Sequence, residues 1–494
     1  MSSPKPHQDF MKTRRRFLGE ASCSAISSIP VMNMLLNLRL ASTAAAQSVP
    51  TDRKTIVCLF LNGGMDSYNL LVPRDATRHG VYSASRGNLA LPLSGAGSVL
   101  PLNQTAGGDG QLYGIHPSCT GLQELFNGLG GDTAKRRAAL ISNIGTLIQP
   151  TTKAQYLAET VPLPRALFSH ADQIDQWQTS VPQGLTEASG WAGRAADILH
   201  ATANIGQTAM NISFSGNNLF QVGNSTQQFV VTQDGALTLT APYDSNPTNP
   251  LAIKNTAHRS LIEQTYANLM QQSYAQLTKS SLDLQQYFQT IFNGYDDSSI
   301  RPLFPPDSAN NYVAQNMLAV AKTIALRQQL GLTRQTIFVS FGGWDHHGEL
   351  LNTQAGMLAA LNAALTPFQK ALDQLGLQDS VITFTASDFG RTLRSNGRGT
   401  DHAWCGNALV MGGPVNGGRI YGSFPDLTLD APDDVGYGGR MLPSTSVDQL
   451  FGELLRWFGV TPANMSYVLP NIANFYNVNS SSLPIGFLRN GTWS

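Results

Sequence analysis

Two short motifs bring together aspartate and histidine, residue types that commonly hold divalent metal ions in proteins. Asp345 and His347 lie in GGWDHHGE, and Asp401 and His402 lie in GTDHAWCG, although the whole chain has only 9 histidines. Mixed carboxylate and imidazole donors suit zinc, manganese or iron, and such an ion can polarise a phosphoryl oxygen. The motifs therefore predict a divalent metal site. We expect His347 rather than His346 to face the ion, because its D-x-H spacing from Asp345 places both side chains on one side of an extended loop.

Two further aspartates follow predicted strands, at the end where ligands bind in α/β proteins. Asp66 comes after the apolar run at residues 55–61, and Asp388 comes after the run at residues 381–386. An aspartate at a strand end either ligates a metal ion or caps the next helix, and both roles stay open for these two residues. Arg391 either grips an anionic substrate or pairs with Asp388.

Ser169 and His170 provide a candidate nucleophile and a neighbouring catalytic imidazole. They lie in ALFSHADQ, a segment typical of a loop that enters a helix, where free N–H groups and the helix dipole favour a bound anion. This placement suits Ser169 as a phosphate acceptor. Alternatively, Ser169 is the N-cap of the helix and Asp172 completes a capping box. Ser67 is a second candidate nucleophile.

A predicted sheet must position these candidates. Apolar runs that end in glycine or small polar residues are typical of strands buried on both faces, and we expect strands at residues 55–61, 137–143, 336–341, 381–386 and 408–411. Helical periodicity occurs at residues 121–127, 260–292, 312–330, 350–375 and 447–458. This alternation predicts an α/β fold with a doubly wound, mainly parallel sheet and helices on both faces. The candidate residues are expected to meet at the carboxyl ends of its strands.

Residues 205–310 interrupt this alternation. An alternating stretch at residues 229–240 carries Asp234-Gly235, a preferred dipeptide of tight hairpin turns, and no crossover helix lies nearby. We therefore expect a small insertion or cap with β structure, within one domain that spans residues 47–494. Its content of Asn, Ser, Thr and Gln suits either a surface that faces a polar ligand or a solvated, loop-rich insertion.

The first 46 residues have the pattern of an export signal. The basic segment TRRRFLG at residues 13–19 precedes an apolar stretch, and small residues at positions 44 and 46 suit cleavage before Gln47. These features are typical of twin-arginine signal peptides. We therefore expect a periplasmic or secreted protein that uses the twin-arginine export machinery. Arg39 interrupts the apolar stretch before it reaches the length of a bilayer span, and the mature chain is expected to have no membrane span.

The composition and the missing motifs narrow the class of protein. The chain has 32 Lys and Arg against 32 Asp and Glu, whereas proteins that bind nucleic-acid backbones need a basic excess, so nucleic acid is not an expected partner. The sequence contains no G-x-S-x-G elbow, no H-E-x-x-H helix and no Walker A loop. Serine esterases of that type, zincins and P-loop enzymes are therefore disfavoured.

Taken in order, the motifs resemble those of an exported bacterial family known as domain of unknown function 1501. They are the twin-arginine leader, FLNGGMDSYNLLVP, YGIHPSC, LFSHADQIDQW, GWAGRAAD, GGWDHHGE, TASDFGRTLRSNGRGTDHAW and GGRIYGSFPDL, and the resemblance covers residues 55–475. A series of motifs in one order is far more specific than any single motif. The family is similar to the alkaline phosphatase and sulfatase superfamily, which implies a doubly wound α/β core with metal at the strand ends.

The resemblance also implies roles for individual residues. Asp345, His347 and His402 correspond to the ligands of one metal ion, whereas Asp66 and Asp388 correspond to ligands of a second ion. Ser169 corresponds to the nucleophile.

Departures from the superfamily pattern fall on the second metal ion. Phe389 stands where alkaline phosphatases have a histidine, and Gly63 stands where they have an aspartate, three residues before Asp66. One metal site is therefore favoured over two. The chain also lacks the C-x-P-x-R motif of formylglycine sulfatases, so the chemistry of that branch is excluded.

Two functions are compatible with these patterns. The first is an exported metal-dependent hydrolase of small anionic phosphate or sulfate esters, with Ser169 or a water molecule as the attacking group. The alternative is a catalytically inactive exported binding or assembly protein that retains the fold. Phe389 and Gly63 favour this alternative, since both weaken the second metal site.

Overall fold

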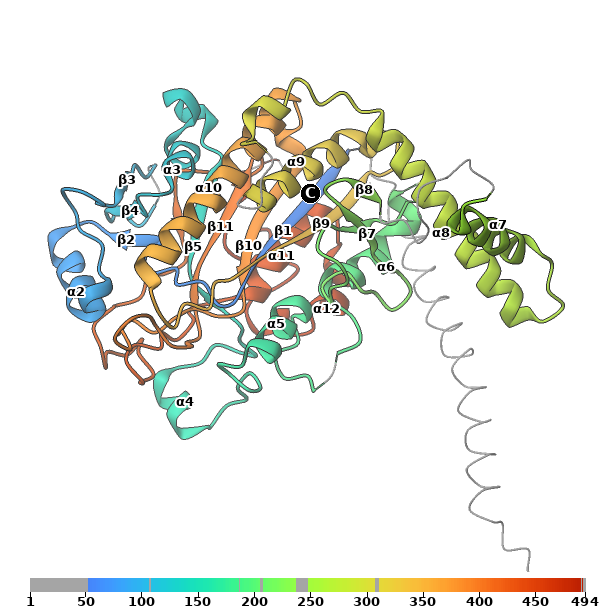
Figure 1. The fold of residues 1–494 in the computed structure, drawn as a ribbon. Helices are drawn as coiled ribbons and strands as arrows, with labels where there is room; N and C mark the ends of the chain where they lie inside the picture. The colour runs from blue at the N-terminus through green and yellow to red at the C-terminus, as the bar shows by residue number, and fades with distance from the viewer. Residues whose placement is uncertain are drawn as a thin grey trace, which may run out of the picture. The chain divides into compact units, whose positions relative to one another are not determined.

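A central sheet organises the chain (Figure 1). From one edge to the other, its strands are β12 (Ile420–Tyr421), β5 (Ala138–Gly145), β11 (Gly406–Gly412), β10 (Val381–Ser387), β1 (Lys54–Asn62), β9 (Arg334–Gly342), β6 (Asn211–Ser213), β7 (Phe229–Thr232) and β8 (Gly235–Ala236), and β13 (Thr445–Ser446) also pairs with β5. A smaller sheet contains β2 (Leu71–Pro73), β4 (Tyr113–Ile115) and β3 (Leu100–Leu102).

The computed structural model describes most of the chain beyond its first 51 residues. The described residues are 52–105, 108–185, 187–204, 208–236, 248–306, 311–489 and 491. The leader predicted at residues 1–46 therefore lies outside the described residues.

Strand directions confirm the predicted α/β class with a mainly parallel sheet. β1 pairs in parallel with both β10 and β9, β6 with β9, β7 with β6, and β12 and β13 with β5. Only β11, which is antiparallel to β10 and β5, and β8, which is antiparallel to β7, depart from this direction among the described strands of the sheet. The five strands predicted from apolar runs are present as β1, β5, β9, β10 and β11.

Helices and apolar side chains enclose the sheet. The helices are α2 (Ala76–Arg86), α3 (Thr120–Asn127), α4 (Lys153–Ala158), α5 (His170–Thr179), α6 (Trp191–Ala203), α7 (Pro250–Glu263), α8 (Leu269–Asn293), α9 (Tyr312–Ala325), α10 (Leu350–Gln374), α11 (Val447–Phe458) and α12 (Pro462–Val468). Successive side chains of a strand point to opposite faces. Leu59 of β1 accordingly belongs to the core shared with α9 and α10. On the other face, Phe60 contacts Phe338 of β9. The Phe338 ring also contacts Phe220, and Phe220 in turn contacts Trp191 of α6.

Part of the segment predicted as an insertion is continuous with the main sheet. Within residues 205–310, β6 and β7 extend the sheet beyond β9, and β7 and β8 form the expected antiparallel hairpin. The rest of the predicted second hairpin strand, residues 237–240, lies outside the described residues. The helix predicted over residues 260–292 is divided, because Asn268 caps a new helix by accepting the N–H groups of Met270 and Gln271.

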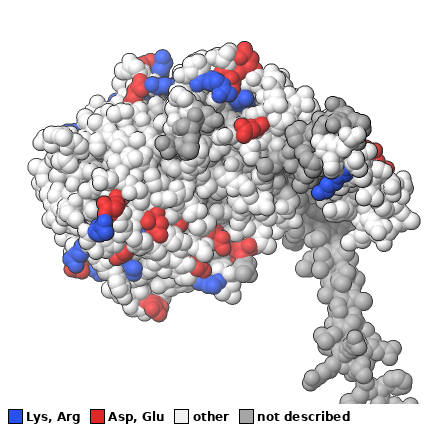
Figure 2. Space-filling model, in the orientation of Figure 1, with Lys and Arg blue, Asp and Glu red and all other residues white. Residues whose placement is uncertain are grey.

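The described part of the chain shows neither a membrane-spanning helix nor a strongly charged face in the view of Figure 2. No helix among the described residues is both long and apolar enough to cross a bilayer. On the face drawn in Figure 2, acidic and basic side chains are sparse and interspersed, without a large patch of one sign.

His116, which follows β4, couples the folded state to acidity. Its side chain is 3% exposed, and its Nδ1 accepts the N–H of Ser118 at 3.1 Å, which requires an unprotonated Nδ1. Burial lowers the pKa of His116 to about 4. Since the unfolded value is about 6.5, the folded chain binds fewer protons between these pH values. The contribution of neutral His116 to the free energy of unfolding is therefore complete above pH 6.5 and is lost as the pH falls towards 4.

Substitution of His116 by Asn is expected to remove this acid sensitivity, because Asn retains an acceptor and does not titrate. Between pH 7 and pH 5, the unchanged chain should lose about 2 kcal/mol more free energy of unfolding than His116→Asn. Urea denaturation of both proteins at the two pH values measures this difference. Equal losses would contradict the assignment.

Candidate metal centre

The candidate site residues lie together at the edge of the central sheet that is formed by the carboxyl ends of its parallel strands. Asp345 and His347 follow the carboxyl end of β9, and Asp388 follows the carboxyl end of β10. Both strands are parallel neighbours of β1. β11 is antiparallel to β10, so its N-terminal end lies at this same edge. His402, which precedes β11, is thereby brought to the other candidates, and an antiparallel bridge pairs it with Arg391.

Two glycines permit the close approach of these turns. Gly63, after β1, has φ +122°, and a Cβ there would lie 2.7 Å from the backbone nitrogen of Asp345. A Cβ at Gly399 would lie 2.3 Å from the carbonyl oxygen of His346. Any side chain would separate the turns. Gly399 therefore accommodates the backbone of the neighbouring turn.

A cluster of His and Asp donors suited to a metal ion occupies this edge. The donor atoms of His170, Asp345 and His402 all lie within 4.8 Å of one another. The Asp345 carboxylate lies 3.6 Å from His170 Nε2 and 3.5 Å from His402 Nε2. His347 adjoins the cluster, with its Nε2 2.9 Å from His402 Nε2 and 3.1 Å from Asp345 Oδ1. Donors of one tetrahedral zinc ion lie about 3.3 Å apart, so these separations fit a shared divalent ion.

Asp388 orients the imidazole of His170. Its Nδ1 lies 2.6 Å from Asp388 Oδ2, and the fully buried carboxylate accepts the Nδ1–H. The lone pair therefore resides on Nε2, which is buried and has no hydrogen-bond partner among the described residues. A carboxylate behind an imidazole in this way fixes the tautomer of metal-binding histidines. An unpartnered Nε2 that faces Asp345 and His402 is what a cation between them would satisfy.

The other two imidazoles repeat this arrangement. His402 Nδ1 lies 2.8 Å from the carbonyl oxygen of Phe168, and His347 Nδ1 lies 3.2 Å from Asp401 Oδ1. Donation from each Nδ1–H again leaves the lone pair on Nε2. Two such lone pairs 2.9 Å apart repel each other unless a cation or proton lies between them. The donor set therefore fits a divalent ion.

Arg391 sets the charge of Asp345. Its guanidinium is fully buried and donates to the Asp345 carboxylate and to the carbonyl oxygens of Gly63, Gly64 and Thr400. Burial acts to raise the pKa of Asp345, but the Arg391 guanidinium outweighs it and holds that pKa below its usual value. Arg391 is thus engaged with Asp345 and the backbone. It neither pairs with Asp388 nor is available to a substrate, the two roles considered from sequence.

His402 is kept neutral by its surroundings. Burial lowers the pKa of His402, and the nearby charge of Arg391 acts in the same direction, against the opposing effect of the hydrogen bond to Phe168. A neutral imidazole is the form that binds a metal ion.

Asp66 is engaged away from this cluster. Its Oδ2 lies 2.6 Å from Nη2 of Arg86, at the end of α2, and both side chains are fully buried. Its Oδ1 accepts the N–H of Tyr68 at 3.3 Å. The structure therefore places Asp66 in a buried ion pair, and no sequence pattern had indicated Arg86 as its partner.

Asp388 and Phe389 also differ in role from the ligands of a second metal ion. One oxygen of Asp388 faces His170, and the other accepts the N–H of Gly63 at 3.0 Å. The ring of Phe389 lies against the imidazoles of His170 and His402, at centroid distances of 4.7 and 4.6 Å. Asp388 therefore orients His170 and holds the turn at Gly63, and an apolar ring lies against the imidazole of His170.

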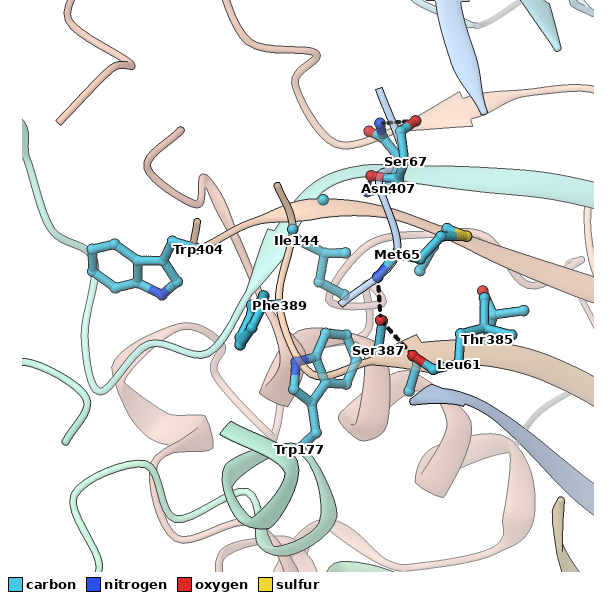
Figure 3. Close-up of a pocket in the computed structure, with 14 residues that line it drawn as sticks. Leu61, Met65, Ser67, Ile144, Trp177, Thr385, Ser387, Phe389, Trp404 and Asn407 are labelled. Carbon is cyan, nitrogen blue, oxygen red and sulfur yellow. Dashed lines mark hydrogen bonds between the residues drawn. The ribbon is translucent and has the colours of Figure 1, made fainter. Parts of the chain in front are cut away.

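The structure does not bring either candidate serine hydroxyl into hydrogen-bond contact with the described donor cluster. Ser169 precedes α5, and its Oγ donates to Asp172 Oδ2 at 2.7 Å. Ser67 is buried, and its Oγ accepts the N–H of Asn407 at 2.7 Å. Ser67 lines a small pocket of about 20 Å³ together with Ser387 (Figure 3), and this pocket has room for about one water molecule.

The segment before α5 carries backbone strain. Ala166 and Phe168 have φ values of 44° and 74°, in the left-handed region that side chains other than glycine rarely adopt. This segment supplies both His170 and the Phe168 carbonyl that holds His402.

Sequence reasoning assigned His170 to catalysis beside Ser169 and missed it as a donor, because a lone histidine at a helix start has no motif spacing. His346 lies away from the cluster, with its Nε2 3.3 Å from the sulfur of Met357.

The comparison with family models decides the classification. Residues 53–469 match the model of the family described as "Protein of unknown function (DUF1501)". The chain belongs to this family. A search of curated proteins found no match for this DUF1501 chain.

Solved structures similar to this DUF1501 protein include members of the alkaline phosphatase superfamily and sulfatases. Ps i-CgsB, solved in complex with k-i-k-neocarrahexaose, is 9% identical, with a TM-score of 0.31 over 85% of this chain and 72% of that chain. A Vibrio parahaemolyticus protein in the alkaline phosphatase superfamily is 12% identical, with a TM-score of 0.30 over 87% and 75%. The PsFucS1 sulfatase from Pseudoalteromonas sp. is 9% identical, with a TM-score of 0.30 over 79% and 69%. Similarity at this level carries no argument about chemistry.

Asp388→Asn is expected to weaken metal binding without unfolding the chain. An Asn amide presents an N–H to His170 Nδ1 and so favours the tautomer with Nε2 protonated, which cannot bind a metal ion. Affinity for zinc should fall about 10- to 100-fold, measured by competition with a chromophoric chelator. Asp172→Asn, a neighbouring carboxylate outside the cluster, is the matched control and should retain affinity. Equal affinity of both variants would exclude the supporting role of Asp388.

Asp66→Asn is expected to affect stability instead. Loss of the carboxylate leaves the buried Arg86 guanidinium without a countercharge, which costs about 3 to 5 kcal/mol of unfolding free energy. Denaturant unfolding measures this loss, and elemental analysis should give the same number of metal ions per chain as the unchanged protein. A lower metal content with unchanged stability would show instead that Asp66 is a ligand.

Proposed function

We propose that this protein is an exported hydrolase of small anionic phosphate or sulfate esters that depends on one divalent metal ion. The carrying observation is the convergence of three imidazole Nε2 atoms, from His170, His347 and His402, on the Asp345 carboxylate. A zinc, manganese or iron ion bound there would polarise an ester oxygen and stabilise the negative charge that develops during hydrolysis.

The charges of the donors suit an anionic substrate. Three of the four donors are imidazoles, and the buried Arg391 guanidinium offsets the Asp345 carboxylate. The four donors together with Arg391 therefore add no net negative charge to a divalent ion, although the Asp388 and Asp401 carboxylates lie behind His170 and His347. The positive charge of the bound ion would attract a phosphate or sulfate group.

One ion is proposed rather than two because the remaining carboxylates are engaged. Asp66 pairs with Arg86, and Asp388 holds His170 and the N–H of Gly63. Phe389 supplies no donor atom on the side of His170 and His402 that it covers.

Ser169 remains the proposed attacking group, with water as the alternative. Its support is that Ser169 adjoins the donor His170 in the chain and donates its hydroxyl to the Asp172 carboxylate, an acceptor for its proton. Export through the twin-arginine machinery to the periplasm or beyond is proposed from the leader motif.

A second candidate function is binding without catalysis. The Phe389 ring, which packs against both His170 and His402, favours it because it narrows access to the donors. In that case the ion would stabilise the fold rather than act on a substrate.

Elemental analysis and an ester screen test the proposal together. Protein purified without chelators or a His tag should hold about one divalent ion per chain and hydrolyse p-nitrophenyl phosphate or p-nitrophenyl sulfate. His402→Ala should lower the turnover about 100-fold or more while the chain stays folded, because it removes a donor. His258→Ala, in α7 and outside the donor cluster, is the control and should leave turnover unchanged.

The outcomes separate the two candidate functions. Absence of any bound ion after addition of zinc or manganese would overturn the hydrolase proposal. One ion per chain with no turnover, and a fall in melting temperature for His402→Ala, would favour the binding protein. Turnover retained by Ser169→Ala would assign the attack to water.

A further inference from the structure

A polar recess opens beside the donor cluster. It has a volume of about 390 Å³, and Arg394, Asn396, Asp401 and Tyr437 are among the residues that line it. Asn396 Nδ2 donates to Asp401 Oδ1 at 3.0 Å and to the carbonyl oxygen of His347 at 3.2 Å. Since Asp401 Oδ1 also faces His347 Nδ1, one wall of the recess directly supports a candidate metal donor.

The recess presents an exposed aromatic ring on a strained loop. Tyr437 is 82% exposed, yet its backbone lies in the left-handed region at φ 56°, between Gly436 at φ 110° and Gly438 at φ 83°. The loop is anchored on both sides: Asp434 accepts the N–H of Gly436 at 2.7 Å, and the carbonyl of Gly438 accepts the N–H of Arg394 at 2.8 Å. Such strain persists only where the surroundings impose it, and it concentrates at functional sites. The exposed ring adds nothing to the core.

Arg440 ties this ring to the donor cluster. Its guanidinium lies 4.5 Å from the centroid of the Tyr437 ring and 3.9 Å from that of Phe168. Its Nε donates to the carbonyl oxygen of His402 at 2.8 Å. Arg440 therefore contacts both the Tyr437 ring and the backbone of His402.

The lining of the recess indicates the chemistry of its ligand. The lining includes hydrogen-bond donors such as Arg394 and Ser395 as well as the carboxylates of Asp401 and Asp430. A hydroxyl group both donates and accepts, so a ligand with several hydroxyls suits such a wall. Among the lining residues, all of which the structure describes, three Asp oppose one Arg, which disfavours a second anionic group. The flat face of an exposed aromatic ring suits the C–H face of a saturated ring.

We propose that this recess binds the alcohol part of the substrate, and that this part is a hydroxylated ring of the sugar type stacked on Tyr437. The inference rests on the proposed function for its link to an ester. The ester group would lie at the donor cluster, and the sugar ring would extend past Asp401 into the recess. Tyr437 then selects the substrate without contacting the reacting atoms.

Neutral sugars test the recess independently of hydrolysis. Saturation-transfer NMR with the methyl glycosides of glucose, galactose, mannose and fucose should show contact between the protein and the ring C–H groups of at least one of them. For that glycoside, Tyr437→Ala should weaken binding about 10-fold, whereas Tyr437→Phe, which keeps the ring, should bind within about twofold of the unchanged protein. Tyr274→Ala, at a 71% exposed tyrosine of α8, is the matched control and should bind normally.

The outcomes distinguish this inference from the proposed function. Binding of none of the four glycosides, or binding that Tyr437→Ala leaves unchanged, would overturn the sugar site. Equal binding of glycerol and the glycosides would also overturn it, because a stacked ring would then be unnecessary. Sugar binding that survives in a chain found to have no esterase activity would support the recess and reject hydrolysis. Hydrolysis of p-nitrophenyl esters without sugar binding would support the proposed hydrolase and reject the sugar site.

Discussion

One buried guanidinium holds the turns of the candidate metal centre together. Arg391 follows β10 and donates to the carbonyl groups of Gly63 and Gly64 after β1, to Thr400 before β11, and to the Asp345 carboxylate after β9. The segments after β1, after β9 and before β11 thus share one cation. Because a buried charge must be fully hydrogen-bonded, these segments are constrained to one arrangement, and Asp345 is kept ionised within it.

The imidazoles are arranged around that anchored carboxylate by a layer of acceptors behind them. Asp388, Asp401 and the Phe168 carbonyl each face an Nδ1 atom, so all three Nε2 atoms turn inward. Two of these acceptors also connect the centre to its surroundings. The strained segment that contains Phe168 packs against Arg440, and Asp401 forms part of the polar recess. Asp401 therefore both orients His347 and lines the recess proposed to bind a sugar.

The same contacts support the proposal of one ion rather than two. The resemblance assigned two carboxylates to a second ion, but each of them contacts another side chain. Asp66 forms an ion pair with Arg86, and Asp388 orients His170. Phe389 covers the neighbouring space with an apolar ring. Within residues 53–469, which match the DUF1501 model, Asp388 and Phe389 contact the donor cluster, whereas Asp66 pairs with Arg86.

The sequence alone determined the features that follow from local pattern. Mainly apolar runs predicted β1, β5, β9, β10 and β11, because strands buried on both faces are mostly apolar. The rule that ligands bind at strand ends then selected Asp345, His347 and His402 correctly as neighbours in space. Only the tertiary structure determined which side chains Asp66 and Asp388 contact. Asp66 and Asp388 look alike in sequence, but Arg86 reaches one and His170 the other, and these contacts depend on how α2 and α5 pack against the sheet edge. Such pairing leaves no periodic signal, because charge and hydrogen bonding act between residues that only the fold brings together.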